Sequence, residues 1–597
     1  MRYAISLLLL MTSLPSYGDS PAEDRETAAA ACRILDNWHA DQPEPGERHL
    51  HIICWTPADR EFPANYRARM TRIMRHIQDF YAGEMLRLGF GNRTIGLQLE
   101  DHQQLVIHEV RGVHNTDHYS GTSGPEIRKE CLPKLQAAGV DADQETIMIM
   151  CNLATWDEQR LAFSHKSPYY ASGTFRNGTA WQLDSPELDT TNLSLKQPLI
   201  RDEQYGRISL GKHNSIFFGG IAHELGHALG LPHCDARPDE SVRGKSLMGS
   251  GYQVYADEVR GEGPGSILTM VDALRLASHP QFSKSNKGIH VTANVAIDDL
   301  SVEADGKAIK VTGIVHGSPP VYAVVAYFDP EGGKDEDATT ASAVPDATGR
   351  FTLRTSALTR GKKVELRLFP LHANGSTAGE TSHTTFRYVF GVAKDGTFDL
   401  SAVQMRQELT NFIAAFRNND QEKARLLEGQ MKSEKASAVA RSFLNPKAVQ
   451  ETPAAYKGRE KQMHLTHFKP TSATVGWGEP IYDRVPEDAM LLDSGGQIFE
   501  TGIYSHAPSS HAYELGKKWT TLSGSVGLAS GHNGAVQFEI KGDGKSLWKS
   551  PVVYSDKTVD FEVEVKGIQN IELLTDPTED GPGADWGLWL EPALKRR

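Results

Sequence analysis

The 597-residue chain has few cysteines, no excess of basic residues and no long apolar stretch after its amino terminus. Its five cysteines are too few for a disulfide scaffold, because at most two bridges can form within the chain. Lys and Arg total 63 against 76 Asp and Glu, and the resulting charge of −13 disfavours nucleic acid as the partner. No interior segment reaches a membrane-spanning length, so we expect no transmembrane helix.

The amino terminus has the pattern of an export signal. Arg2 precedes an apolar run from Ala4 to Met11, and small residues follow at Ser16 and Gly18. We therefore predict a signal peptide over residues 1–18 and a protein exported to the periplasm, the cell surface or the medium. A buried amino-terminal strand is the alternative, but the polar residues from Asp19 fit a processed start better.

Length and periodicity predict several domains of a multidomain α+β fold. Strand-like runs such as 146–151 mix with helical patterns at 66–88, 214–230 and 267–277, the last with Ser266 as its expected N-cap. Short alternating runs separated by turns then indicate a β-sandwich. The predicted units after the signal peptide are an α/β domain (19–284), a central β-sandwich (285–395), a helical linker (396–448) and a carboxy-terminal β-sandwich (449–597).

Three histidines in the first unit have the spacing of a metal site. Residues 223–233 read HELGHALGLPH within an apolar helical segment. His223 and His227 are four residues apart, so both imidazoles leave the same face of the helix. Gly230 lets the chain leave the helix and Pro232 stops it from resuming, so the turn can present His233 as a third ligand.

This donor set predicts a catalytic Zn²⁺, because three protein ligands leave the fourth position of the ion open. Glu224 lies beside the metal, where its carboxylate can accept a proton from the attacking water and return it to the leaving amine. The alternative is an apolar helix that carries three histidines by chance, which this specific spacing makes improbable.

The segment resembles the extended zinc signature of the metzincin metallopeptidases, and Met248 in Ser-Leu-Met-Gly resembles the Met-turn of that family. The resemblance implies a metzincin-like α/β catalytic domain and a zinc endopeptidase. Several metzincins carry a tyrosine two places after the Met that stabilises the transition state. Ser250 occupies that place here, so Tyr252 and Tyr255 are the candidates for this role, and ordinary packing is the alternative for both.

Two further features allow more than one interpretation. His114 and His118, in the sequence HNTDH, are either part of a second metal site or members of a polar loop, and the loop is the simpler interpretation. Cys234, directly after the third histidine, is either a metal or redox switch or a structural cysteine, and the structural role is favoured.

The carboxy-terminal unit resembles the NPCBM family of carbohydrate-binding modules. The resemblance rests on GIYSHAP at 502–508, the strand and turn from Val536 to Lys545, and Ala-Asp-Trp at 584–586. It implies a β-sandwich that binds glycans. Sugar recognition needs aromatic rings and polar side chains, and His506, Asp585 and Trp586 are the strongest candidates because they lie in the motif loops.

These features favour an exported zinc endopeptidase held on glycoproteins or glycan-rich surfaces by its terminal module. A glycan-binding adhesin or adaptor with a non-catalytic peptidase-like domain is the alternative, although Glu224 is not needed to hold a metal and its presence favours catalysis. A glycoside hydrolase is a third possibility, but no segment has a recognisable pair of catalytic carboxylates.

Overall fold

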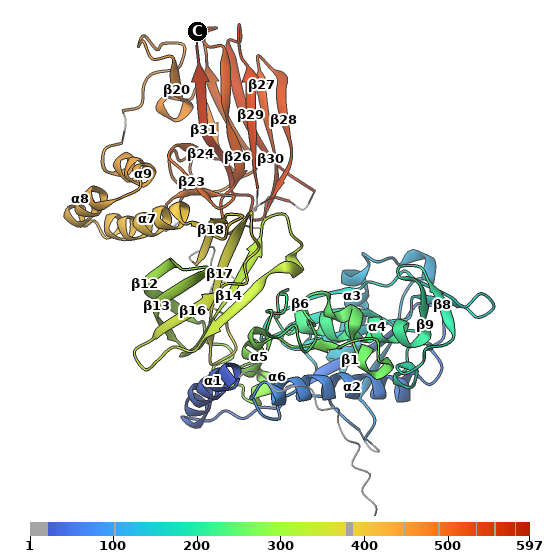
Figure 1. Ribbon diagram of the computed structural model, residues 1–597. Coiled ribbons are helices and arrows are strands. Elements are labelled where there is room, and N and C mark those ends of the chain that lie inside the picture. Colours follow the sequence, from blue (N-terminus) through green and yellow to red (C-terminus); the bar gives the residue numbers. More distant parts are fainter. Residues whose placement is uncertain are drawn as a thin grey trace, which may run out of the picture.

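The structure of the protein is a computed structural model that describes residues 22–100, 103–377, 386–446, 448–486, 490–532, 534–554, 557–579 and 581–596. The predicted signal peptide lies outside these residues. Figure 1 shows the carboxy-terminal β-domain above a central β-sandwich, with a mixed α/β unit beside the sandwich.

A five-stranded sheet of order β2-β1-β3-β7-β6 forms the centre of the α/β unit. All its pairings are parallel except that of the edge strand β6 with β7. The strands alternate between two apolar clusters, because Ile52 and Met148 face one cluster whereas Ile53 and Ile149 face the other. The strands are β1 (Leu50–Thr56), β2 (Ile107–Arg111), β3 (Thr146–Cys151), β6 (Tyr170–Gly173) and β7 (Gly178–Leu183).

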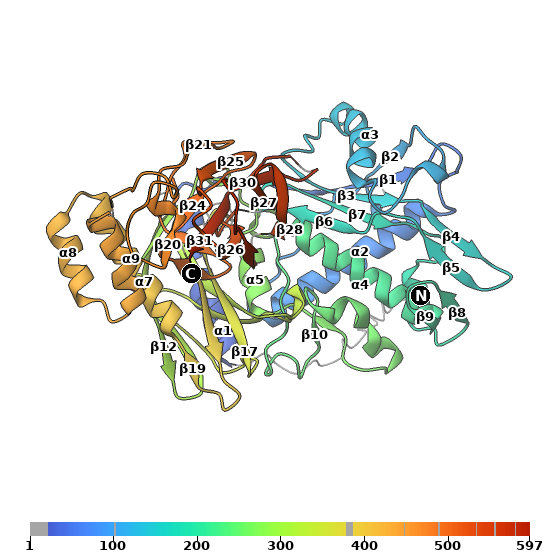
Figure 2. The ribbon, with the colours of Figure 1, turned by 90° about the horizontal axis from the view of Figure 1, so that it is seen from above.

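Helices cover both faces of this sheet. The helices α2 (Tyr66–Arg87) and α4 (Leu210–Ala228) bury their apolar residues in the first cluster, and α3 (Gly124–Ala137) buries its own in the second. Figure 2 shows α2 and α4 side by side along the strands. A smaller sheet of order β4-β5-β8-β9 extends the unit, with strands β4 (Ala154–Asp157), β5 (Ala162–His165), β8 (Leu199–Asp202) and β9 (Gly206–Ser209).

The α/β unit is completed by elements from both ends of its sequence. The helix α1 (Ala22–Ala40) packs against α5 (Met270–Ala277) and a strand of the central sandwich, β14 (Val321–Pro330). The short strands β10 (Lys245–Ser246) and β11 (Ser266–Ile267) pair with each other, and α6 (Pro280–Ser283) follows α5. Ser266 is therefore a strand residue, and the N-cap of α5 is Thr269, which forms a capping box with Asp272.

The central sandwich has two antiparallel sheets, β12-β13-β16 and β15-β14-β17-β18-β19. Their alternating apolar residues form one cluster between the sheets. The remaining strands are β12 (Asn294–Asp305), β13 (Ala308–Ser318), β15 (Thr339–Ala343), β16 (Arg350–Thr355), β17 (Lys362–His372), β18 (Arg387–Val392) and β19 (Phe398–Asp399).

Three helices connect the two sandwiches: α7 (Ser401–Arg417), α8 (Gln421–Gln430) and α9 (Glu434–Leu444). The terminal domain then packs two sheets, β20-β31-β26-β29 with β24 beside β31, and β21-β25-β30-β27-β28. Its strands are β20 (Gln462–His464), β21 (Ser472–Thr474), β22 (Leu492–Ser494), β23 (Gln497–Phe499), β24 (Gly502–Tyr504), β25 (Ser509–Glu514), β26 (Thr521–Leu528), β27 (Ala535–Gly542), β28 (Lys545–Tyr554), β29 (Thr558–Glu564), β30 (Asn570–Pro577) and β31 (Gly587–Lys595).

The predicted multidomain α+β fold is confirmed. In the described part of the chain, every helix is too short or too polar to cross a membrane. The five cysteines are all unpaired, and four of them, including Cys234, are buried.

Candidate active site

Helix α4 carries His223, Glu224 and His227. It packs against the edge strand β6 and its neighbour β7. Ser209 caps the helix by accepting a hydrogen bond from the Lys212 backbone N–H at 3.0 Å. Nearly all its residues are buried. At its carboxy-terminal end the sheet approaches very closely, because a Cβ on Gly178 would lie 1.9 Å from the carbonyl oxygen of Ala228. This contact fixes the end of the helix against β7.

The turn after α4 presents His233 to the other two histidines. Gly230 has a φ of +85°, a left-handed conformation that glycine adopts readily, as predicted for the exit from the helix. The backbone N–H of Leu231 then donates back to the carbonyl of Gly226 at 2.9 Å. The N–H of Cys234 donates to the carbonyl of Met248 at 3.3 Å, so the backbone is anchored on both sides of His233.

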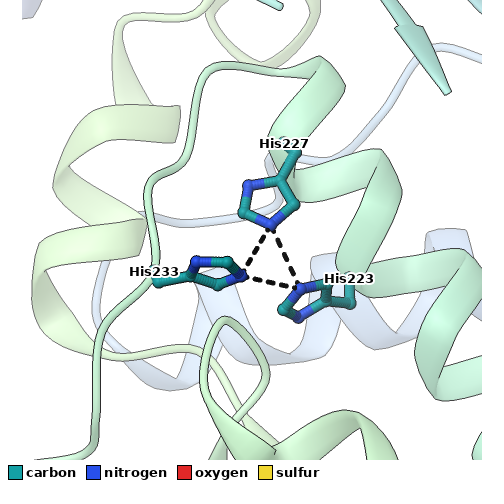
Figure 3. A group of neighbouring side chains, drawn as sticks. All are labelled: His223, His227 and His233. Carbon is teal, nitrogen blue, oxygen red and sulfur yellow. Dashed lines mark hydrogen bonds between the residues drawn. The ribbon is translucent and has the colours of Figure 1, made fainter. Parts of the chain in front are cut away.

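The three imidazoles converge on one point. Their Nε2 atoms are separated by 3.1 Å (His223 and His227), 3.0 Å (His227 and His233) and 3.3 Å (His223 and His233), and Figure 3 shows this triangle. In a tetrahedral zinc site with Zn–N bonds of about 2.0–2.1 Å, donor atoms lie about 3.3–3.4 Å apart. The spacing of the three nitrogens therefore fits one zinc ion.

Backbone carbonyls set the protonation of two of these rings. Nδ1 of His223 donates to the carbonyl of Leu247 at 2.7 Å, and Nδ1 of His227 donates to that of Leu231 at 2.8 Å. With its proton on Nδ1, each neutral ring turns the lone pair of Nε2 toward the centre. Burial, reinforced by the neighbouring His227, lowers the pKa of His223 to about 3, so this ring is neutral at pH 7. Converging lone pairs repel one another unless a cation lies between them.

Met248 lies beneath the histidines and is fully buried. Its thioether packs against the backbone of α4 so closely that a Cβ on Gly226 would lie 2.5 Å from the sulfur. Met248 therefore supports the helix between the turns that carry His223 and His227.

Glu224 faces a pocket of about 340 Å³ that also contains the three histidines. Burial raises the pKa of Glu224 to about 7, and the nearby His233 opposes this shift. The carboxylate thus lines the same pocket as the imidazole cluster but takes no part in the nitrogen triangle.

The structure separates the two candidate tyrosines. Tyr252 lines the pocket, with its ring centroid 5.2 Å from that of His223. Tyr255 is only 2% exposed and packs against His76 and Phe80 of α2. Tyr252 is therefore among the described residues that line the pocket, and Tyr255 is not. The prediction for Tyr255 was wrong, because this side chain is part of the core.

Several pocket residues had no signal in the sequence. Tyr169 comes from the segment before β6, Gln204 and Tyr205 from the β8–β9 turn, and Glu336 from the central sandwich. They come from three distant segments, so no spacing pattern links them to α4. Only the tertiary structure places a carboxylate of the sandwich, Glu336, at the pocket of the α/β unit.

A second candidate surface lies at one end of the terminal sandwich. Trp586 stacks on His532 with ring centroids 4.1 Å apart and an interplanar angle of 15°. Trp477 lies 5.1 Å from Trp586 and is 54% exposed. His506 lies 6.2 Å from Trp586. These rings form an aromatic surface after β21 and in the β24–β25, β26–β27 and β30–β31 loops, in which Trp477 is exposed and the other three rings are largely buried.

The three sugar-binding candidates have different positions in this surface. His506 and Trp586 belong to it but are only 8% and 9% exposed, and Asp585 is fully buried. Its Oδ1 accepts a hydrogen bond from the backbone N–H of Ala535 at 3.0 Å, so this carboxylate organises the start of β27. The prediction for Asp585 is thereby corrected to a supporting role. The exposed Trp477 was missed because it lies outside the motif loops.

Comparison with protein-family models identifies the terminal domain. Residues 461–595 match the NPCBM/NEW2 domain. The NPCBM prediction is therefore confirmed for this part of the chain. No curated protein matches the sequence.

Among solved structures, wild-type OgpA from Akkermansia muciniphila is similar with 24% identity, over 59% of this chain and 95% of OgpA, at a TM-score of 0.48. Catalytically inactive OgpA from the same organism, in complex with an O-glycopeptide substrate, is 21% identical over 58% of this chain and 94% of OgpA, with a TM-score of 0.49. The CBM51 module of a Clostridium perfringens GH95 protein, in complex with methyl-galactose, is 23% identical over 22% of this chain and 99% of the module, with a TM-score of 0.21. At such TM-scores these similarities carry no argument about activity.

Proposed function

We propose that the chain is an exported zinc endopeptidase of the metzincin type that cleaves glycoproteins and is directed to them by its NPCBM domain. The observation that supports the peptidase is the triangle of Nε2 atoms at 3.0–3.3 Å, with two of the rings oriented by backbone carbonyls. Glu224 and Tyr252 in the same pocket supply the groups that peptide hydrolysis needs beside the ion.

Five residues of the pocket have a role in this proposal. His223, His227 and His233 would hold Zn²⁺, which when bound polarises the scissile carbonyl and acidifies water. Glu224 accepts a proton from the attacking water and donates it to the leaving amine. Tyr252 donates a hydrogen bond to the oxygen that becomes negatively charged in the transition state.

Cleavage by purified protein tests the proposal most directly. We expect peptide products from glycoproteins, loss of these products with a zinc chelator, and recovery when zinc is added back. Glu224→Gln keeps the shape of the side chain but removes the base, so we expect kcat to fall by about 10²- to 10⁴-fold with zinc still bound. The matched control is Glu203→Gln, an exposed acid next to the pocket residue Gln204, which should leave kcat unchanged.

The glycan part of the proposal has its own readout. The substrate panel contains native glycoproteins, their deglycosylated forms and an O-glycopeptide. We expect a preference for the glycosylated forms that Trp477→Ala abolishes, because a sugar ring stacks on an exposed indole. Tyr554→Ala, at another exposed aromatic residue of the same domain, is the control and should keep the preference.

Either half of the proposal can be overturned separately. If folded, zinc-loaded protein cuts no peptide bond in the panel while it still binds glycans, the adhesin alternative replaces the peptidase. If cleavage proceeds equally on both substrate forms, the terminal domain does not direct the enzyme to glycans. The amino-terminal residue of the exported protein, measured by mass spectrometry, tests removal of residues 1–18.

A further inference from the structure

A second group of metal-binding side chains lies outside the active-site pocket. His114 follows β2, and His118 ends the short 3-10 turn Thr116–His118. The fold adds a carboxylate that the sequence spacing does not reveal, because Glu126 of the first turn of α3 points to the same place. One ligand atom from each of the three residues lies within 4.8 Å of the others.

The arrangement of these side chains is close to that of a metal site. Nε2 of His118 lies 2.9 Å from Oε1 of Glu126, and Nε2 of His114 lies 4.0 Å from the same oxygen. The two imidazole rings have centroids 3.9 Å apart and are inclined by 32°. Donor atoms on one tetrahedral zinc ion are about 3.3 Å apart, so a small rotation of the His114 ring completes the set.

Hydrogen bonds hold the backbone that carries these ligands. Asp59 accepts from the backbone N–H of Thr116 at 2.8 Å and from its hydroxyl at 2.9 Å. The hydroxyl of Tyr119 accepts from the backbone N–H of His114 at 3.0 Å and donates to Glu130 at 2.8 Å. Only side-chain rotations therefore remain to be restricted when an ion binds, which lowers the entropy cost of binding.

We propose that His114, His118 and Glu126 form a second zinc site. Two neutral imidazoles and one carboxylate are a donor set that zinc accepts. The side chains are 47%, 44% and 43% exposed, respectively, so water can occupy a fourth position and the ion can enter directly from solvent. The site is independent of the proposed peptidase activity, because it shares no residue with the histidine triangle.

The site would join the loop after β2 to α3 beside the wall of the active-site pocket. A Cβ on Gly124 at the start of α3 would lie 2.2 Å from the hydroxyl of Tyr170, which lines that pocket. An ion bound to Glu126, two residues farther along α3, therefore stabilises the end of the helix that supports Tyr170. The function that we assign to the ion is structural.

Zinc stoichiometry of the full chain tests this site without any activity measurement. In His223→Ala/His227→Ala protein, stripped of metal with a chelator and titrated calorimetrically with Zn²⁺, we expect one remaining equivalent. Adding His118→Ala or Glu126→Gln should remove it. The matched control is His316→Ala, because His316 is an exposed histidine with a carboxylate partner, Asp298, 3.6 Å away. This control should keep the equivalent.

Two results overturn the proposal. One is that no zinc remains bound in the His223→Ala/His227→Ala protein, and the other is that the remaining zinc survives both His118→Ala and Glu126→Gln. Far-UV circular dichroism establishes that each variant is folded. If the double variant does not fold, Glu126→Gln alone is compared with the unaltered chain, and the proposal then requires the bound zinc to fall from two equivalents to one.

Discussion

Gly220 allows a close contact that shapes the pocket containing the three histidines. It lies one helical turn before Glu224 on α4, and the hydroxyl of Tyr169 sits directly over it. A Cβ at this position would lie 1.4 Å from that hydroxyl oxygen and 2.5 Å from the adjacent ring carbon. The absence of a side chain thus allows the phenol of Tyr169, from another segment, to reach the helix face that carries Glu224.

We predict that Gly220→Ala displaces Tyr169 and destabilises the protein. Glycine to alanine inside a helix normally stabilises by about 0.5–1 kcal/mol, but here the steric clash should cost about 1–3 kcal/mol. The matched control is Gly83→Ala in α2, where an added Cβ meets no atom within 4 Å. The melting temperature of each variant measures the change. A Gly220→Ala protein whose melting temperature equals or exceeds that of the unaltered chain contradicts the prediction.

Glu240 connects elements that are far apart in the sequence. Its fully buried carboxylate accepts hydrogen bonds from the backbone N–H groups of Met270, at the start of α5, and of Arg237, at 2.7 and 2.9 Å. The guanidinium of Arg237 in turn donates to Asp24 of α1 at 2.8 Å. This network attaches α1 to the segment that follows His233.

We predict that Glu240 makes stability depend on pH. Burial raises its pKa from 4.5 to about 7, although Arg237 opposes the shift. Between these values the folded protein keeps a proton that the unfolded chain has lost. The free energy of unfolding therefore falls as pH rises through this window, by up to about 1.4 kcal/mol per pH unit.

Melting temperatures from pH 4.5 to 7 check this sign. Glu240→Gln removes the titrating group, so its melting temperature should fall less with rising pH than that of the unaltered chain. Glu203→Gln, at an exposed glutamate, should keep the original slope. Equal slopes for Glu240→Gln and the unaltered chain would show that Glu240 does not gain a proton on folding.

Element boundaries were predictable where local chemistry sets them. The strand 146–151 was predicted with its exact limits, since a run that is apolar after Thr146 fits a parallel sheet covered on both faces. The cap of α5 was predicted wrongly at Ser266, because pairing with β10 draws this residue into a strand. The hydroxyl of Ser266 instead donates to the carbonyl of Gly251 at 2.7 Å. Such long-range pairing leaves no local trace.

Across the whole molecule, the α/β unit and the central sandwich share one core. Tyr322, Tyr327 and Leu371 of the sandwich belong to the same apolar cluster as α4 and α5. Arg275 of α5 donates to the hydroxyl of Tyr327 at 3.0 Å and to the carbonyl of Gly230 at 3.2 Å. The sandwich therefore supports the turn that presents His233, besides contributing Glu336 to the pocket.

We predict that the α/β unit is not stable without the sandwich. A chain ending at Lys284 exposes the apolar face that the sandwich covers, and burial of each large apolar side chain contributes about 1.5–3 kcal/mol. Its melting temperature should be at least about 10 °C below that of a chain ending at Asp399. Equal melting temperatures for the two chains would show that the shared cluster does not contribute to stability.

The sequence alone determined the grouping of the three histidines, the position of Glu224 beside them and the NPCBM domain. The spacing of His223 and His227 is fixed by the helical repeat, and Gly230 and Pro232 fix the turn to His233. Only the tertiary structure decided that Tyr255 is a core residue and that Glu336 reaches the pocket. It also decided that Glu126 joins His114 and His118. The reason is physical: a helix or turn fixes neighbours a few residues apart, whereas contacts between distant segments depend on how whole elements pack.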